Sequence, residues 1–277
     1  MPPRATTVLA LALLAAPATA APAPVFTPKP GMDGKDVIWV PTPDPLIQRM
    51  LTMAQVTARD LVVDLGSGDG RTVIAAAKQF GARAVGIEFN PELVELARRG
   101  AQQLGLTPAR AQFLHADIFK SDFSDATVVT LYLLPNLNRR LRPTLLSMRP
   151  GTRVVSHQFA MDDWEPDETS YVEQRVAHLW IVPARVGGGW RVERPGGAFD
   201  LDLEQMYQRI RGRAQLADGV RVGLREPRLR GDRIDFTLVD ERGATLEFTG
   251  RVLADRIVGT VVRDGVSAAW SATRRAD

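Results

Sequence analysis

The sequence predicts an α/β fold, in which an open parallel sheet flanked by helices is followed by a small antiparallel β-barrel domain. Short apolar runs alternate with helical segments of about a dozen residues as far as residue 183, a pattern typical of right-handed βαβ units. A glycine-rich turn at residues 66–70 separates the first apolar run from the first helix. Beyond Gly187-Gly188-Gly189, short strands separated by turn residues predict the second domain.

The parallel-sheet domain is expected over residues 37–185. Its first strand, residues 61–65, is almost entirely apolar, as expected for a strand that is buried on both faces. One helix begins after Asn90 as its cap, with Pro91 at the first position, and ends at Gly105. The other predicted strands cover residues 83–89, 111–115, 126–132, 152–159 and 172–183, and the other helices cover residues 72–80 and 136–148, the second of them interrupted at Pro143.

The β-domain is expected over residues 186–277. About eight strands at near-regular spacing predict an antiparallel meander that closes into a small barrel. These strands lie at residues 190–193, 199–203, 207–214, 220–224, 234–239, 245–252, 257–262 and 268–273. We expect Trp190 to plug one end of the barrel, and Phe199, Tyr207, Phe236, Phe248 and Trp270 to lie in its core or lining.

The N-terminus has the layout of a secretory signal peptide. The first four residues carry one positive side chain, residues 8–16 are apolar, and Ala18-Thr19-Ala20 matches an A-x-A cleavage site. We expect cleavage after Ala20, export to the periplasm, and a linker at residues 21–36. The alternatives are an unstructured leader rich in alanine and proline, or an uncleaved inner-membrane anchor. The apolar run is shorter than the roughly 20 residues of a membrane-spanning helix.

The amino-acid composition excludes several classes of functional site. The 277 residues are 45% hydrophobic and 24% charged, as is usual for a globular protein, and the net charge of +3 is thinly spread. Without a basic stripe interleaved with aromatics, nucleic-acid binding has no support. The chain has no cysteine, which excludes disulfides, thiolate metal sites and a cysteine nucleophile. His115, His157 and His178 lack metal-ligand spacing, so no metal is predicted.

The glycine-rich turn follows a strand that contains an acidic residue. In Asp64-Leu65-Gly66-Ser67-Gly68-Asp69-Gly70, glycine at alternate positions lets the backbone approach a ligand closely. Dinucleotide-binding folds use the spacing G-x-G-x-x-G instead, with pyrophosphate on the helix N-terminus and no need of that acid. Because the Asp64 carboxylate could pair with an ammonium group, the turn favours a cofactor that has an amino-acid end.

Two further carboxylates accompany the next two strands. Glu88 ends the second strand, where an acid can accept hydrogen bonds from both hydroxyls of a ribose. Asp117 follows the third strand, where it could meet an adenine amino group or could equally be a solvated loop residue. Ligands of open α/β sheets bind at the carboxyl ends of the strands. The carboxylates therefore predict one cofactor site at this edge.

Five stretches give the sequence a specific resemblance: Val40-Pro41-Thr42-Pro43 and residues 64–71, 85–88, 128–135 and 152–159. The chain resembles class I S-adenosylmethionine-dependent methyltransferases, and more closely the bacterial and mitochondrial family of membrane-associated protein-lysine methyltransferases. It is distantly similar to the non-SET histone lysine methyltransferases, which have Asn at about the position of Tyr132. The resemblance spans residues 39–183 and leaves the β-domain out.

This resemblance implies a Rossmann-like class I methyltransferase sheet and S-adenosyl-L-methionine as the cofactor. The residues implied in cofactor binding are Thr42 as part of a flap, Asp64, Gly66, Ser67 and Gly68 for the methionine part, Glu88 for the ribose, and Asp117 with Ile118 for the adenine. The residues implied in lining the acceptor pocket are Tyr132, Leu133 and Pro135.

The predicted reaction is methyl transfer to an amine, with a protein lysine as the expected acceptor. Displacement from a sulfonium depends on proximity, orientation and desolvation, so a dedicated base is optional. The amine must still lose a proton, and Tyr132 and His157 are the candidate catalytic residues that would orient or deprotonate it. His157 could instead be a hydrogen-bonded histidine at a strand end. The chain lacks the Asn/Asp-Pro-Pro-Tyr/Phe motif of enzymes that methylate bases and glutamine.

Two other functions stay open at this point. An exported, non-catalytic binding protein could carry its function in the β-barrel and keep the Rossmann-like part as a relic. An NAD-dependent oxidoreductase is disfavoured by the glycine spacing. The predicted export conflicts with a cofactor that is made in the cytoplasm. Either the leader stays as an inward-facing anchor, or the cofactor reaches the other side, or the fold has been repurposed.

Overall fold

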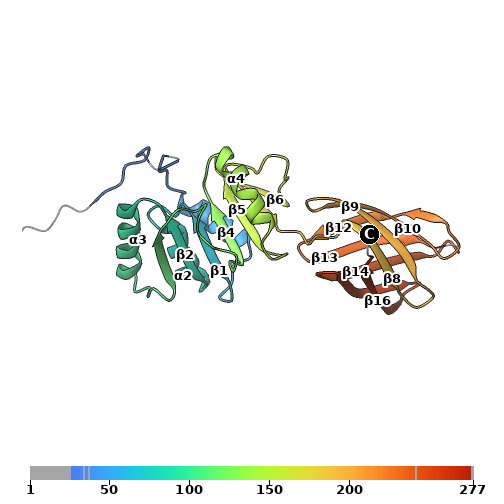
Figure 1. Cartoon of the computed structure of the whole chain (residues 1–277). Coiled ribbons are helices and arrows are strands. Elements are labelled where there is room, and N and C mark those ends of the chain that lie inside the picture. Colours follow the sequence, from blue (N-terminus) through green and yellow to red (C-terminus); the bar gives the residue numbers. More distant parts are fainter. Residues whose placement is uncertain (1–25, 34, 37, 241, 276–277) are drawn as a thin grey trace, which may run out of the picture.

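The structure is a computed structural model that describes residues 26–33, 35–36, 38–240 and 242–275 (Figure 1). The predicted signal peptide and its cleavage site lie outside these residues. Two sheets follow one another along the chain, a mixed α/β part and then an all-β part (Figure 1). None of the helices in the described part of the chain has the length and apolar character that a membrane span requires.

The first sheet has seven strands in the order β3-β2-β1-β4-β5-β7-β6. Their bounds are β1 (Leu61–Leu65), β2 (Arg83–Glu88), β3 (Ala111–His115), β4 (Val128–Leu131), β5 (Arg153–His157), β6 (Glu168–Val172) and β7 (Arg175–Ile181). Strands β1 to β5 are parallel. In register, Leu65 on β1 lies beside Ile87 on β2 and Leu131 on β4. The carboxyl ends of these strands therefore share one edge.

Helices cover both faces of this sheet. Val62 of β1 belongs to a hydrophobic core with α1 (Asp44–Met53), α2 (Arg71–Phe80) and α3 (Pro91–Gln103). Val63 belongs to a second core with α4 (Pro135–Leu146). Because successive side chains of a strand face opposite sides, a strand between two such cores must be apolar at nearly every position. This confirms the predicted α/β fold class.

The helix boundaries follow from local chemistry. Asn90 caps α3 as expected, because its side-chain oxygen accepts from the backbone N–H groups of Glu92 at 2.8 Å and Leu93 at 3.3 Å. Gly81 ends α2 in the left-handed region, at φ +68°. The expected interruption at Pro143 is wrong, since α4 runs continuously through it. A proline removes one helical hydrogen bond, and the N–H of Ser147 still donates to the Pro143 carbonyl at 3.2 Å.

Several other elements differ from those expected. Helix α1 was not predicted at all. The strand expected at residues 172–183 is present as β7, but the strand before it, β6, was not predicted, and the two form a hairpin that turns at Glu173, where φ is +55°. Strand β7 pairs antiparallel with β5, so the sheet is not wholly parallel. Strands β2, β4 and β5 also end before Phe89, Tyr132 and Phe159, which leaves these three aromatic residues in loops at the carboxyl edge.

The second sheet has nine antiparallel strands in the order β11-β10-β9-β8-β16-β15-β14-β13-β12. Their bounds are β8 (Gly188–Glu193), β9 (Phe199–Met206), β10 (Arg209–Gln215), β11 (Arg221–Gly223), β12 (Arg225–Arg230), β13 (Arg233–Val239), β14 (Thr245–Leu253), β15 (Arg256–Arg263) and β16 (Val266–Arg274). Strands β8 and β16, the first and last of this part of the chain, pair with each other. The two edge strands, β11 and β12, are consecutive in the sequence. The sheet therefore forms a nearly closed barrel.

The barrel core is aromatic. Trp190 is fully buried and its indole N–H donates to the Val186 carbonyl at 2.7 Å. The rings of Phe236 and Phe248 stack at 4.7 Å, and Trp270 meets the Phe248 ring edge-on at 5.2 Å. Strand β12 was missed because Pro227 and a register shift between Arg225 and Arg228 interrupt its pattern. Tyr207 is not in this core, and it packs against the first sheet's domain instead.

Candidate active site

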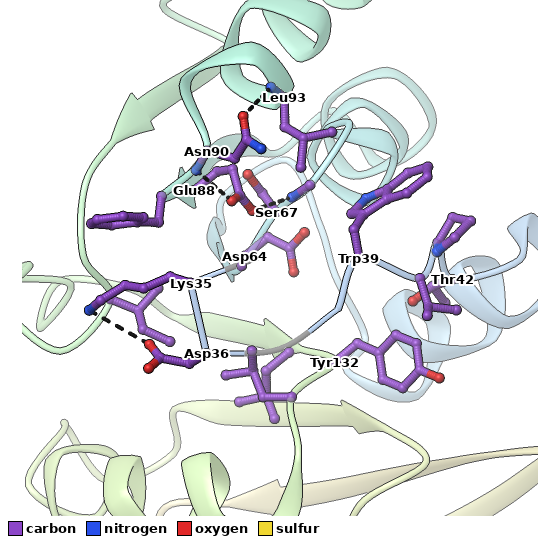
Figure 2. Close-up of a pocket in the computed structure, with 18 of the residues that line it drawn as sticks. Lys35, Asp36, Trp39, Thr42, Asp64, Ser67, Glu88, Asn90, Leu93 and Tyr132 are labelled. Atoms are coloured by element: carbon purple, nitrogen blue, oxygen red, sulfur yellow. Dashed lines mark hydrogen bonds and ion pairs between the residues drawn. The ribbon is translucent and has the colours of Figure 1, made fainter. Parts of the chain in front are cut away.

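A cavity of about 300 Å³ opens at the carboxyl edge of the parallel strands, a typical size for a ligand pocket (Figure 2). The loops that follow β1, β2, β3 and β4 line it, and so do residues 33, 35–36 and 38–42, which precede α1. Of the predicted site residues, those that line the cavity are Thr42, Asp64, Gly66, Ser67, Gly68, Glu88, Asp117, Ile118, Tyr132 and Leu133. His157 and Pro135 do not line it.

The glycine-rich loop is tightly packed on two sides. The N–H of Gly66 donates to the Ile87 carbonyl on β2 at 2.8 Å, which holds the loop against the neighbouring strand. Gly68 has φ +53°, and a Cβ there would lie 2.5 Å from the indole nitrogen of Trp39. Glycine is therefore required at Gly68 for both conformation and space. Trp39 was not among the predicted site residues.

Asp64 is a buried carboxylate at the floor of the cavity. It is 6% exposed, and the hydroxyl of Thr130 on β4 donates to Oδ1 at 2.6 Å. Burial raises the pKa of Asp64 to about 7, against the hydrogen bond from Thr130, and the nearby charges of Glu88 and Asp69 add to the rise. A cationic group in the cavity would favour the ionised carboxylate.

Glu88 bridges two loops with its carboxylate. Oε2 accepts from the N–H of Gly68 at 2.9 Å, and Oε1 accepts from the N–H of Asn90 at 2.8 Å (Figure 2). Each oxygen has a second lone pair, so both can accept another hydrogen bond. The nearby Ser67 hydroxyl is buried and has no hydrogen-bond partner among the described residues. A buried polar atom of this kind commonly has a partner that the protein does not supply.

Asp117 is held by a lysine that sequence reasoning missed. Lys35 Nζ lies 2.6 Å from Oδ2, and the N–H of Phe119 donates to Oδ1 at 2.9 Å. The hydrogen bond from Lys35 holds the pKa of Asp117 below its usual range. The ammonium also lies 4.9 Å from the centre of the Phe89 ring. Lys35 comes from a segment with no regular pattern, so no sequence signal places it here.

The segment that carries Trp39 and Thr42 lines the cavity beside Asp64 (Figure 2). Its position is set at Thr42, which is buried. Arg71 Nη1 donates to the Thr42 carbonyl at 3.3 Å, and the Thr42 hydroxyl lies 3.0 Å from His157 Nδ1. Thr42, the residue that the resemblance implies as part of a flap, is thus held by Arg71 on α2 and His157 on β5.

His157 lies behind the cavity wall. Its ring is fully buried and packs against that of Tyr132, with 3.8 Å between the ring centres and a tilt of 31°. Burial, with a smaller contribution from the charge of Arg175, lowers the pKa of His157 to about 4, so the ring is neutral near pH 7. With Nδ1 engaged by Thr42 and Nε2 buried without a partner among the described residues, His157 holds the flap and Tyr132 in position.

The wall beside Tyr132 is apolar. Leu133, Leu137 and Phe159 line it, and the ring of Phe159 stacks on that of Tyr132 with 6.2 Å between centres. Pro135 is exposed and forms the first residue of α4, where it helps to start the helix. The cavity therefore has an acidic side, formed by Asp64 and its neighbours, and an apolar side that offers few hydrogen-bonding groups.

Comparison with known proteins identifies the family. The profile of the ANTKMT methyltransferase domain matches residues 64–168. A protein-lysine N-methyltransferase of Saccharolobus islandicus is 46% identical over 152 residues, which cover 53% of this chain and 94% of that protein. The chain belongs to the protein-lysine N-methyltransferase family. The adenine nucleotide translocase lysine N-methyltransferase of Mus musculus is 42% identical over 46% of this chain and 55% of its own length.

A solved structure supports the same class. An RNA methyltransferase of Salinibacter ruber, in complex with S-adenosyl-L-homocysteine, is 49% identical over 53% of this chain and 96% of its own, with a TM-score of 0.52. The protein is therefore a class I methyltransferase with S-adenosyl-L-methionine as its cofactor. Neither the oxidoreductase nor the non-catalytic alternative has support.

Proposed function

We propose that this methyltransferase N-methylates a lysine side chain of a membrane-associated protein, using the residues of the cavity described above. The observation that carries the proposal is the two-sided cavity, in which the acidic side is suited to the cofactor and the apolar side to the acceptor. An apolar wall with one phenol suits the methylene stem of lysine better than a base or a carboxylate, because it has no multi-point hydrogen-bonding edge.

The polar groups of the cavity fit the cofactor. The Asp64 carboxylate would pair with its ammonium, and the free lone pairs of Glu88 would accept from its ribose hydroxyls. The Ser67 hydroxyl, which has no partner in the described part of the chain, and the backbone of Gly68 would contact the methionine part. Asp117 and Ile118 would meet the adenine, with Asp117 shared between the adenine and Lys35.

The chain's own contribution to catalysis is desolvation and orientation. S-adenosylmethionine supplies a methyl group on a sulfonium. Leu133, Leu137 and Phe159 would exclude water from the amine, which lowers its pKa and makes the neutral nucleophile available. The bound cofactor would supply its methyl group to the nitrogen lone pair and leave as the neutral thioether, and the amine proton would pass to water. Tyr132 would orient the amine, and His157 would fix Tyr132 through ring packing.

Exposed apolar side chains at the mouth of the cavity support the proposal that the acceptor is a membrane-associated protein. Three large apolar side chains from separate segments line the mouth and are exposed: Ile38 at 52%, Phe89 at 46% and Leu134 at 39%. Exposed apolar residues that gather around a pocket commonly mark an interaction site. Related enzymes from mouse are named for lysines of the ATP synthase and of adenine nucleotide translocase. We propose that the leader, residues 1–20, is the export signal that brings the enzyme to this acceptor.

The test is transfer of tritium from labelled S-adenosylmethionine into membrane and periplasmic extracts of the native host. We expect label in protein that survives ribonuclease and lipid extraction, with methylated lysine detected by mass spectrometry. Asp64→Asn should strongly lower labelling when S-adenosylmethionine is subsaturating, whereas Asp125→Asn, at an exposed carboxylate of the same domain, should leave it unchanged. Label confined to RNA, lipids or small molecules would overturn the lysine proposal and leave the methyltransferase class standing.

A further inference from the structure

The turn between β9 and β10 contains a tyrosine in a conformation that favours glycine. Strand β9 ends at Met206 and β10 begins at Arg209, so Tyr207 and Gln208 form a two-residue hairpin turn. Tyr207 has φ +56°. Glycine is the usual residue at the first position of such turns, because a bulky side chain with positive φ is strained. Strain of this kind persists where the surrounding structure holds the residue, and often at functional sites.

The Tyr207 side chain contacts the methyltransferase domain. Its hydroxyl donates to Asp163 Oδ2 at 3.0 Å, and its ring stacks on that of Trp164 with 6.1 Å between centres and an interplanar angle of 27°. The guanidinium of Arg142, on α4, lies 5.7 Å from the same ring. The strained turn therefore places an aromatic ring on the other domain.

Gln208 and Arg209 extend this contact. The Trp164 indole N–H donates to Gln208 Oε1 at 3.0 Å, and Gln208 Nε2 donates to the Glu165 carbonyl at 2.7 Å. Arg209 forms an ion pair with the Glu165 carboxylate. Trp164 is fully buried, so the hairpin satisfies a buried indole N–H that would otherwise lack this partner. Three successive residues of the hairpin thus contact residues 163–165.

These contacts hold the loop that forms part of the acceptor wall. Residues 158–167 follow β5, and both Gln158 and Asp162 have positive φ, at +70° and +62°. Phe159, near the start of the loop, lines the cavity and stacks on Tyr132. From α4, Asn138 Nδ2 donates to the Phe159 carbonyl at 3.1 Å. Among the described residues, α4 holds the start of the loop, and the middle is held both by α4, through Arg142 Nη1 and the Met161 carbonyl at 2.9 Å, and by the barrel hairpin.

The hairpin itself is anchored to the chain that joins the two domains. Gln205, two residues before Tyr207, accepts at Oε1 from the N–H groups of Val186 at 2.6 Å and Gly187 at 3.0 Å. Its Nε2 donates to the Ala184 carbonyl at 2.8 Å. This side chain fixes the connecting segment to β9, so the position of the hairpin tip relative to the loop is set.

We propose that the β9–β10 hairpin of the barrel-like domain is a positioning element for the acceptor side of the cavity, with Tyr207 and Gln208 as positioning residues. The hairpin fixes residues 163–165, and the strained loop transmits this constraint to Phe159 and the wall around Tyr132. The inference rests on the proposed protein-lysine activity. It assigns the domain outside the matched family profile to acceptor use, and it predicts that cofactor binding is independent of the hairpin.

The experiment compares three full-length variants with the wild type. Tyr207→Gly removes the ring and relieves the backbone strain, and Tyr207→Phe keeps the ring and removes the hydroxyl. Ala254→Gly relieves the same kind of strain, at φ +53°, in the turn between β14 and β15. Initial rates of tritium transfer are measured against the membrane-protein fraction that the wild type labels. Cofactor affinity is measured by calorimetry, and exchange protection is measured over residues 158–166.

We expect Tyr207→Gly to lower the rate at subsaturating acceptor by about tenfold, because small misplacements of a reacting group have large kinetic effects. Its affinity for S-adenosylmethionine should stay within about twofold, and exchange in the loop should rise by about tenfold. Tyr207→Phe should recover most of the rate, and Ala254→Gly should match the wild type. A lower transfer rate at unchanged cofactor affinity would indicate a positioning role, because general destabilisation would lower both.

Two results would overturn the inference. Tyr207→Gly that labels protein at the wild-type rate would show that the hairpin does not influence the acceptor. A parallel loss of cofactor affinity and rate would show a general structural role instead. If the wild type labels no protein at all, the proposed acceptor class fails. The loop-exchange comparison of Tyr207→Gly with Ala254→Gly then decides whether the hairpin holds the wall, because equal protection in the two variants overturns that part independently.

Discussion

The two sheets of this protein differ in where their sequences place charge. In the first sheet the central strand β1 is apolar apart from Asp64, whose buried carboxylate is an exception that the fold does not require. In the barrel-like sheet, acidic residues such as Asp202 and Glu204 on β9 face basic residues such as Arg213 and Arg211 on β10, all exposed. Exposed charge of this kind is ordinary, whereas a buried carboxylate is rare.

This difference teaches that a functional residue is visible where it departs from what its surroundings require. Asp64 departs by being charged inside a buried strand, so the sequence alone indicates a ligand. Tyr207 departs through a backbone angle, φ +56°, which only a structure reveals. The barrel-like sheet therefore looks functionally silent in sequence, although its hairpin reaches the loop behind the acceptor wall.

The largest expected effect concerns Gly259 and tests whether the two sheets unfold separately. A Cβ at Gly259 would lie 1.9 Å from the backbone oxygen of Thr249 on the neighbouring strand. Because that backbone cannot move without breaking the β14–β15 ladder, Gly259→Ala should destabilise the barrel-like sheet by about 3 kcal/mol. Denaturant unfolding followed by near-ultraviolet circular dichroism measures this change.

Gly223→Ala is the matched control, because a Cβ there meets no atom within 4 Å. If the sheets are separate units, Gly259→Ala should still bind S-adenosylmethionine with an affinity within about twofold of the wild type. Loss of cofactor binding in step with loss of the barrel signal would show that the two sheets form one cooperative unit. The two sheets could then no longer be compared as separate folding units.

The next effect sharpens the role of the buried carboxylate. Asp64→Asn should weaken S-adenosylmethionine binding about thirty- to hundredfold, or about 2–3 kcal/mol, because a hydrogen bond to a charged group is lost. The unliganded protein should not lose stability, since a neutral amide avoids the cost of burying a charge. Calorimetry and thermal unfolding of the same variant check both statements. Unchanged affinity in a folded variant would remove Asp64 from the cofactor site.

The raised pKa of Asp64 adds a pH dependence. The unfolded chain ionises this group near its ordinary value, whereas the folded protein keeps the proton up to about pH 7. The contribution of Asp64 to stability is therefore greatest at low pH and is lost as the pH rises from about 4 to about 7. The cofactor's ammonium group, in contrast, would bind the ionised carboxylate of Asp64 more tightly than the protonated carboxyl.

Cofactor affinity should follow the opposite trend. As the pH falls from about 7 to about 5, the dissociation constant for S-adenosylmethionine should rise by about tenfold per unit, because binding must release the Asp64 proton. Calorimetry in buffers of different ionisation enthalpy counts that proton. Asp64→Asn should show a much flatter profile, and a profile equal to the wild type's would assign the pH dependence to another group.

The parts of the site that were predictable share a simple origin. Asp64, Glu88 and Asp117 are readable because parallel strands end at one edge, so position along the chain determines position in space. Trp39 and Lys35 were not readable, because they lie in an irregular segment whose course depends on contacts with residues far away in sequence. Gly68 offers a partial signal for Trp39, since its missing side chain leaves space for the indole.

The fold errors have related causes. Strand β6 was missed, and with it the β6–β7 hairpin, because the turn at Glu173, where φ is +55°, carries no glycine. The helix α4 continues through Pro143 because packing of Leu141 and Leu145 into the core outweighs one missing hydrogen bond. Periodicity predicts which face is buried, and it is insensitive to features that depend on a single backbone angle.

The smallest expected effect concerns the lysine that holds Asp117. Lys35 Nζ lies on Oδ2 of Asp117, where an adenine amino group would also donate, so the lysine competes with the cofactor. An exposed ion pair of this kind contributes little, and Lys35→Ala should tighten S-adenosylmethionine binding by only about two- to fivefold. Lys35→Met is the matched variant, because it keeps an apolar stem over Phe89 and removes the charge. Both variants should bind more tightly than the wild type in calorimetry. Weaker binding by both would show that the ammonium belongs to the cofactor site, and the flap would then complete the acidic side of the cavity instead of competing for it.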